Sequence, residues 1–160
     1  AVMGDNLATA IYTNSGNGVV HDAALRDREG IQEIEGVASF ARAWHPSYAS
    51  PTIMLVGVNT PIRIGQATVM PGDVVLGKDD GVVFVPPHLA EKLVKTSELV
   101  QLRDTFGKGR LREGKYTPGQ IDTRWTDDIE RDFSAWLEDH IDALSVPREA
   151  IQEMLKERTW

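Results

Sequence analysis

The order of elements predicted over residues 4–27 constrains the fold of this chain more than any other feature. The segment indicates in turn a glycine turn, a helix, a glycine loop and a short strand (Gly4, 5–13, 14–18 and 19–20). In open α/β sheets, ligands bind at the carboxyl ends of strands and at helix N-termini, where unpaired backbone N–H groups attract anions. The segment therefore favours an α/β fold with an anion-binding end near Gly4.

Arg26 and Asp27 follow this segment as a cation beside an acid. Such a pair suits a carboxylate ligand held together with a divalent metal, because the metal takes the acid's oxygen while the guanidinium binds the ligand's oxygens as a fork. The residue types alone leave a second interpretation open, which is a surface ion pair beside a tight loop.

Size and composition narrow the class of protein. A chain of 160 residues is long enough for one hydrophobic core and too short for two comfortable domains. The sequence has no cysteine, which excludes a disulfide scaffold, a thiolate metal site and a cysteine nucleophile, and fits a cytoplasmic protein. No apolar run approaches the roughly 18 residues that cross a bilayer, so we expect no membrane partner.

The charge of the chain argues against nucleic acid as a partner. The net charge is −7, from 17 basic and 24 acidic residues, and such a protein repels phosphate backbones unless it carries a local basic patch. The best candidate patch spans residues 103–115, where Asp104 and Glu113 dilute it and Phe106 is the aromatic residue available for stacking. We prefer to interpret it as a solvated loop after a helix.

Short apolar runs separated by Gly, Pro, Asn or Asp predict further strands in the first half of the chain (37–40, 53–58, 62–64, 74–76 and 82–85). A helix is then expected from Pro87 to about Phe106, ended by Gly107 and Gly109.

The last third of the chain is predicted to be helical. A 3.6-residue apolar stripe follows a plausible N-cap at Thr126 (Ile129, Phe133, Trp136, Leu137, His140, Ile141 and Leu144). Pro147 begins a final predicted helix that carries further apolar residues (Ile151, Met154 and Leu155). These patterns divide the chain into three parts, which are an α/β domain, a linker and a helical extension (1–106, 107–125 and 126–160).

Four motifs in order and spacing carry a resemblance to a known family (residues 4–8, 22–27, 70–75 and 79–86). Over about residues 2–100 the chain resembles the family of regulator of ribonuclease activity A and the class II pyruvate aldolases, such as 4-hydroxy-4-methyl-2-oxoglutarate aldolase. The resemblance implies a layered β/β/α swivelling domain, here with a C-terminal helical extension, and assembly into homotrimers or hexamers. Family members also carry a segment before the Gly-Asp motif, so we expect a missing N-terminal segment or a second chain to complete this fold.

The resemblance implies a divalent-metal-dependent lyase that acts on small 2-keto acids. Its reactions are retro-aldol cleavage that releases pyruvate, or decarboxylation of oxaloacetate, both through a pyruvate enolate. Asp27 is the implied ligand of Mg²⁺ or Mn²⁺, with waters filling the other positions. Arg26 is implied to bind the keto or enolate oxygen and the carboxylate of the substrate.

The remaining roles that the resemblance implies lie in the two acidic motifs. Backbone amides around Asn6 and Leu7 are expected to hold the substrate carboxylate, with Gly4 permitting close approach. Asp5 is expected to act as the proton relay through a water on the metal, and Asp22 to orient Arg26 or a water.

Two further predictions concern the class of function and the histidines. The chain has both acids of the metal-dependent branch (Asp5 and Asp27), which favours an enzyme, while the rival function is a non-catalytic, protein-binding regulator of a ribonuclease. His21 is expected to be a hydrogen-bonded strand residue rather than a metal ligand, and His45 to be an ordinary loop residue rather than part of a pocket wall.

Overall fold

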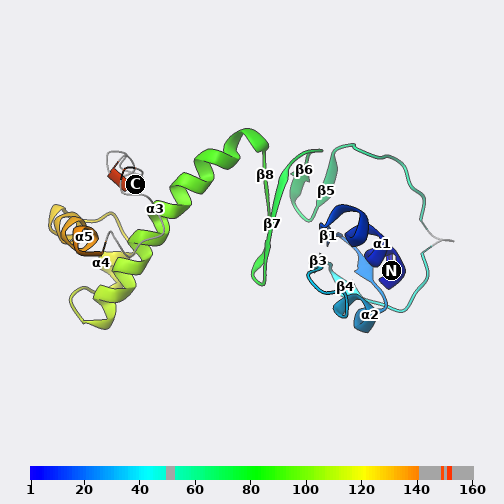
Figure 1. The fold of residues 1–160 in the computed structure, drawn as a ribbon, viewed down its shortest axis with the longest axis horizontal. Coiled ribbons are helices and arrows are strands. Elements are labelled where there is room, and N and C mark those ends of the chain that lie inside the picture. Colours follow the sequence, from blue (N-terminus) through cyan, green and yellow to red (C-terminus); the bar gives the residue numbers. More distant parts are fainter. Residues whose placement is uncertain (50–52, 141–148, 150, 153–160) are drawn as a thin grey trace. The chain divides into compact units, whose positions relative to one another are not determined.

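The computed structural model describes residues 1–49, 53–140, 149 and 151–152, and the chain divides into two compact units, Ala1–His88 and Leu89–Trp160. The first unit holds α1 and α2 with eight short strands (α1 Asp5–Ser15, β1 Val19–Val20, β2 Ala24–Leu25, α2 Arg28–Gln32, β3 Ser39–Phe40, β4 Ala43–Trp44, β5 Ile62–Ile64, β6 Ala67–Val69, β7 Val74–Lys78 and β8 Gly81–Val85). The named helices that follow in the described part of the chain are α3, α4 and α5 (α3 Pro87–Arg112, α4 Pro118–Ile121 and α5 Asp127–His140). The predicted α/β fold with a helical C-terminal extension is confirmed (Figure 1).

Parallel pairing organises the first half of unit 1. β1 pairs with β3, and β2 pairs with β4 in a register that sets Leu25 opposite Trp44. Met3 forms a parallel bridge to Leu25, so the segment around Met3, β2 and β4 lie side by side and run in one direction. Two antiparallel hairpins follow, β5–β6 and β7–β8.

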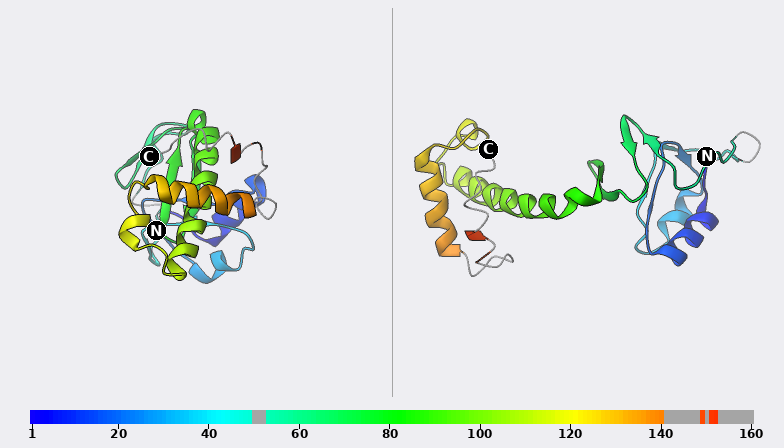
Figure 2. Two further views of the ribbon diagram at one scale, coloured as in Figure 1. Left: turned by 90° about the vertical axis from the view of Figure 1, so that its left-hand side faces the viewer. Right: turned by 90° about the horizontal axis from the view of Figure 1, so that it is seen from above.

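A small apolar cluster fastens the helices to these parallel strands. Met3 and Leu25 come from the strand segments, Ala8 from α1 and Ile31 from α2, and all four are buried. α1 lies beside α2 in both views of this unit (Figures 1 and 2). Burying side chains of this size contributes about 1.5–3 kcal/mol each for the larger ones, so this cluster fixes the strand ends relative to both helices.

The strand predicted over 53–58 is wrong. The backbone there forms no strand, and the apolar side chains are exposed, with Met54 at 83% and Val56 at 93%. A strand needs a neighbour to accept and donate its backbone hydrogen bonds, and within the described residues no segment pairs with this run.

The helix predicted to end near Phe106 continues to Arg112. Gly107 does not end it because this glycine admits a neighbour: a Cβ at Gly107 would lie 2.7 Å from Ile121 Cγ2, where α4 packs. The chain leaves the helix at Gly114, whose φ of 69° lies in the left-handed region that glycine favours. The residues predicted to form a linker therefore hold the last turns of α3 and all of α4, while the predicted domain boundaries stay a prediction.

Unit 2 is built around an aromatic core. Phe106 from α3 packs against Phe133 of α5 and against Trp125, with ring centroids 5.3 Å apart in each pair. Ile129 and Leu137 of the predicted stripe are buried in this core, as is Ile151, which was predicted for the final helix, whereas His140 of the stripe is exposed. Four other residues predicted for the stripe and the last helix lie outside the described residues (Ile141, Leu144, Met154 and Leu155).

One cation is buried at the edge of this core. The guanidinium of Arg103 donates to both carboxylate oxygens of Glu130, at 3.2 and 2.8 Å, and its Cζ lies 3.7 Å from the centroid of a Trp125 ring. The fork and the ring together satisfy a charge that is costly to bury alone. Within the described part of the chain, no helix has the length and apolar character needed to cross a lipid bilayer.

Candidate functional site

Three parallel segments end at one edge of unit 1. The amide of Arg26 donates to the carbonyl of Met3 at 2.9 Å, and the amide of His45 donates to the carbonyl of Leu25 at 2.8 Å. The residues that follow the three segments therefore meet at their carboxyl ends, where α/β folds place ligands. They are Gly4-Asp5, Arg26-Asp27 and His45-Pro46.

Gly4 lies at this edge, directly against the side chains of Arg26 and Asp27. It is buried and precedes α1 with φ −120° and ψ −172°, an extended backbone that any residue adopts. Its need for glycine comes from contact instead: a Cβ there would lie 2.8 Å from Arg26 Nε and would overlap the Asp27 carboxylate. The predicted close approach at Gly4 is thus made by the Arg26 and Asp27 side chains.

Asp5 begins α1, and its carboxylate is already engaged on one side. Oδ1 accepts the amide of Asn6 at 2.7 Å, so that amide serves Asp5 rather than standing free for a substrate carboxylate. The Leu7 amide belongs to the first turn, where amides lack an intrahelical acceptor. On its other side Asp5 packs against Gly30 of α2, where a Cβ would lie 2.8 Å from Asp5 Cβ. The role of Gly30 could not be predicted from the sequence, since a single glycine in a short helix carries no specific signal.

Asp27 has the most unusual backbone of the site. It is the N-cap of α2 with φ 55° and ψ 52°, the left-handed region that is uncommon for residues other than glycine. Its side chain makes no capping hydrogen bond and instead forms an ion pair with Arg26, Nε to Oδ2 at 3.5 Å, with both side chains about 40% exposed. A strained residue whose carboxylate is kept out of the cap is typical of functional positions.

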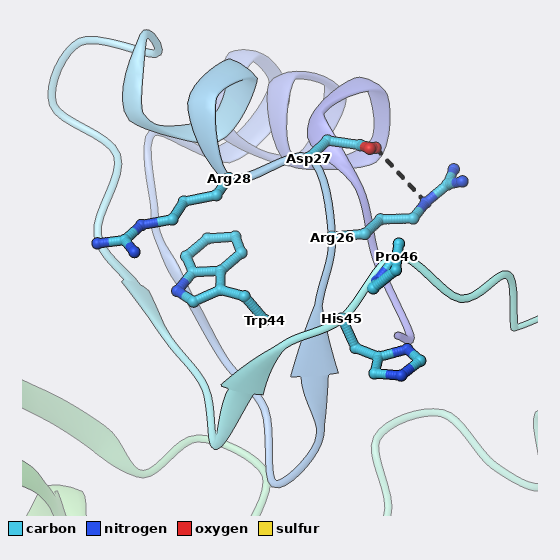
Figure 3. A pocket seen from close by; sticks show the side chains of 6 residues that line it. All are labelled: Arg26, Asp27, Arg28, Trp44, His45 and Pro46. Carbon is cyan, nitrogen blue, oxygen red and sulfur yellow. Dashed lines mark ion pairs between the residues drawn. The ribbon is translucent and has the colours of Figure 1, made fainter.

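A pocket of about 270 Å³ opens beside this pair. Its lining is shown in Figure 3 (Arg26, Asp27, Arg28, Trp44, His45 and Pro46). The Arg28 guanidinium lies 5.8 Å from the centroid of a Trp44 ring. His45 Nδ1 accepts the Ser47 amide at 3.1 Å, so a neutral ring carries its proton on Nε2. The expectation that His45 is an ordinary loop residue is wrong, because it lines this pocket.

Asp22 does not orient Arg26, and this part of the prediction is wrong. Its carboxylate forms an ion pair with Arg42 and accepts the Gly65 amide at 2.8 Å, which fastens the β5–β6 turn. Hydrogen bonds from Arg42 and then from the Gly65 amide hold the pKa of Asp22 below its usual range. Asp22 precedes β2 and Arg26 follows it, so a rise of about 3.3 Å per residue sets them at opposite ends of the strand.

His21 differs from the expected hydrogen-bonded strand residue. Its amide donates to the carbonyl of Phe40 at 2.8 Å, but its buried ring Nε2 has no hydrogen-bond partner among the described residues. Burial lowers the pKa of this imidazole, which favours the neutral ring.

The oxygen donors at the edge fit a hard divalent cation. Within the described residues no three His, Asp or Glu side chains form a ready-made metal cage. Mg²⁺ commonly binds through one or two carboxylates and completes its shell with water and substrate oxygens. The half-exposed Asp27 carboxylate, free of a cap bond, meets that requirement.

Two comparisons relate this chain to known proteins. The model of a family described as RraA-like, Aldolase/RraA, matches residues 1–84. A crystal structure of an uncharacterized protein from Pseudomonas syringae pv. tomato str. DC3000 superposes with a TM-score of 0.68 at 26% sequence identity. The match covers 76% of this chain and 56% of that one, so this chain spans a little over half the length of the solved relative.

Proposed function

This chain belongs to the RraA-like family (Aldolase/RraA), and from that premise we propose that it is a divalent-metal-dependent lyase acting on 2-keto acids. The observation that carries the proposal is the placement of Asp27, strained and uncapped beside Arg26 above the bare Cα of Gly4. The reaction is retro-aldol cleavage that releases pyruvate, or decarboxylation of oxaloacetate.

Both reactions break a carbon–carbon bond next to a keto acid and leave the electron pair in a pyruvate enolate. Negative charge grows on the former keto oxygen, so the site must offer positive charge there. Arg26 supplies a fork for the keto oxygen and the neighbouring carboxylate. Asp27 is the residue that would hold Mg²⁺ or Mn²⁺, whose chemistry when bound is Lewis-acid polarisation of the keto group.

Asp5 is suited to the proton transfer of the aldol reaction. Its carboxylate lies in the first turn of α1, where the helix dipole stabilises negative charge. We assign it the removal of the aldol hydroxyl proton, directly or through water. Oδ1 keeps its bond to the Asn6 amide, so we assign the proton to Oδ2, which lies against Gly30 of α2.

The test is pyruvate release from oxaloacetate and from 4-hydroxy-4-methyl-2-oxoglutarate, with Mg²⁺ and with a chelator. Asp27→Ala is expected to lower kcat/KM by about 100-fold or more, as expected for loss of an electrostatic group that acts in the transition state. Asp80→Ala, which removes a carboxylate at the β7–β8 turn, is the matched control and should leave turnover unchanged. Metal-independent turnover, or full activity in Asp27→Ala, would contradict the proposal.

The family description also names the regulator class, and a protein-binding regulator of a ribonuclease is the rival function. A regulator that acts by surface contact should be indifferent to the chelator and to Asp27→Ala. Inhibition of a ribonuclease by both the unaltered chain and Asp27→Ala, without pyruvate release, would favour that rival.

We also propose that the chain works as a homo-oligomer, a trimer or hexamer. The support is the β7–β8 hairpin, in which consecutive apolar residues point to opposite faces and are all about half exposed (Val74, Val75 and Leu76). Two apolar faces on one hairpin need cover from elsewhere. Light scattering after gel filtration tests this, and a monodisperse monomer would refute it.

A further inference from the structure

We propose that Gly30 is a positioning residue for Asp5, so that aldol cleavage depends on this glycine while decarboxylation does not. This inference rests on the proposed function of the same site, because it takes Asp5 as the group that removes the aldol hydroxyl proton. Gly30 has no side chain to offer a substrate, and its effect is therefore exerted through Asp5.

The Asp5 carboxylate occupies the space that a side chain at position 30 would fill. α1 and α2 lie side by side, and Asp5 is the first residue of α1 (Figures 1 and 2). A Cβ on Gly30 would lie 2.8 Å from Asp5 Cβ and would overlap Asp5 Oδ2. A Cβ in a folded protein essentially never lies within 3.0 Å of a nonbonded heavy atom. Any larger residue at position 30 must therefore displace Asp5 or push the two helices apart.

Space rather than backbone conformation explains the glycine at this position. Gly30 is the third residue of α2 and does not have a positive φ, so other residues could adopt its backbone. Within a helix, glycine is the least favourable residue after proline. A residue that weakens its own helix without a backbone reason is expected where a functional contact requires it. The contact that Gly30 permits is the one with Asp5.

The other side of the Asp5 carboxylate is held by its own helix. Oδ1 accepts the Asn6 amide at 2.7 Å, and the Asp5 carbonyl accepts the Thr9 hydroxyl at 2.9 Å. With Oδ1 held, a methyl group at position 30 displaces Oδ2 or breaks the bond to Asn6. Oδ2 is the oxygen assigned to the proton, and an error of about 1 Å in the place of a reacting atom can cost about 100-fold in rate.

The two proposed reactions differ in their need for this base. In aldol cleavage Asp5 takes the hydroxyl proton, the O–H electron pair forms the new carbonyl, and the broken C–C bond leaves its electrons in the pyruvate enolate. In decarboxylation of oxaloacetate the departing carboxylate is already ionised, so CO₂ leaves and the same enolate forms without removal of a proton. Protonation of the enolate carbon follows in both. A displaced Asp5 should therefore slow aldol cleavage and spare decarboxylation.

The test measures both reactions with Mg²⁺ in the full chain. In Gly30→Ala, kcat for pyruvate release from 4-hydroxy-4-methyl-2-oxoglutarate should fall by about 10- to 100-fold with little change in KM. The kcat for oxaloacetate should stay close to that of the unaltered chain, which also shows that the variant folds. Gly109→Ala is the matched control, because Gly109 lies within α3 and a Cβ there would meet nothing within 4 Å. It should change neither reaction.

A double-substitution cycle separates positioning from a structural effect. Asp5→Asn keeps the size of the side chain and removes the base, so it should lower aldol cleavage at least as much as Gly30→Ala does. Adding Gly30→Ala to Asp5→Asn should then cause little further loss, because the base that it displaces is already absent. A structural defect in α2 would instead lower kcat again by the same factor.

The outcomes separate this inference from the proposed function. Equal loss of both reactions in Gly30→Ala, or no loss of either, overturns the role of Gly30 and leaves the lyase proposal standing. Losses that multiply in the double variant overturn that role as well. Absence of pyruvate release from either substrate by the unaltered chain overturns the lyase proposal and the role of Gly30 together.

Discussion

The left-handed backbone of Asp27 makes a prediction that separates stability from chemistry. With φ 55° and ψ 52°, an L-residue at this position is strained by about 1–2 kcal/mol relative to the right-handed region. Glycine escapes that strain, and asparagine tolerates the region better than alanine does. We therefore compare Asp27→Gly, Asp27→Asn and Asp27→Ala.

The other contributions of the Asp27 side chain to stability are small. The Arg26–Asp27 ion pair, at 3.5 Å between side chains about 40% exposed, contributes about 0–1 kcal/mol. No capping bond is lost, because the Asp27 side chain makes none. Glycine has more conformational freedom than alanine in the unfolded chain, and this offsets about 0.5–1 kcal/mol of the strain energy that Asp27→Gly removes. The free energy of unfolding of Asp27→Gly should therefore be roughly 1 kcal/mol higher than that of Asp27→Ala. This difference corresponds to about 4–8 °C in Tm for a unit of this size.

Thermal unfolding followed by circular dichroism checks the order of stability, and pyruvate release is measured on the same samples. The expected order of Tm is Asp27→Gly above Asp27→Asn above Asp27→Ala, with turnover lost in the glycine and alanine variants alike. Gly16→Ala calibrates the backbone term, because Gly16 has φ 67° and a Cβ there would meet nothing within 4 Å. Its Tm should fall by an amount close to the gap between the alanine and glycine variants at Asp27.

Two results would refute this reasoning. Equal Tm values for Asp27→Ala and Asp27→Gly, together with a drop in Gly16→Ala, would show that Asp27 is not left-handed. Full turnover in the more stable Asp27→Gly would show that the carboxylate has no part in the reaction.

Three further substitutions test neighbouring parts of the chain. Gly4→Ala should lower kcat/KM about 100-fold in steady-state assays by displacing the side chains above it, with little change in Tm because its backbone is extended. Arg103→Ala should lower the free energy of unfolding in urea by about 2–3 kcal/mol, less than a fully buried pair, because the Glu130 side chain is 35% exposed. Asp132→Asn should lower Tm at neutral pH. Burial raises the pKa of Asp132, but hydrogen bonds from Arg110, Lys115 and Tyr116 outweigh it and leave the pKa below 3.8. Its stabilisation is therefore present above pH 3.8 and is lost as the pH falls through the lower folded value, so the Tm gap to Asp132→Asn should close in strong acid.

The part of the site that the sequence predicted is the part that is local. Gly4-Asp5 begins the predicted helix 5–13 and Arg26-Asp27 follows the predicted strand 19–20, so chain order alone indicated these two motifs. The pocket wall could not be found that way. Arg28 meets Trp44 only because β2 and β4 pair in one particular register, and no periodicity in the sequence reports the register of strands two residues long.

The same distinction explains which elements were predicted correctly. The stripe on α5 fixes its own burial, because one helix face carries the whole signal and α3 supplies the opposing surface. The end of α3 depends instead on Ile121, which packs where Gly107 lacks a side chain. A glycine read only along the chain indicates a helix end, whereas the same glycine read across the fold is a point of close helix packing.

The run at 53–58 shows that residue preference alone does not make a strand. Its β-branched and apolar residues have the preference of a strand, but that preference reflects packing on a half-buried, paired surface more than the backbone itself. Within the described residues nothing pairs with the run, and its apolar side chains are exposed, from 56% at Ile53 to 93% at Val56. A helix forms its backbone hydrogen bonds within one segment, whereas a strand forms them with a neighbouring segment. Residue preferences can therefore predict that 53–58 is suited to be a strand, and only an available edge decides whether it becomes one.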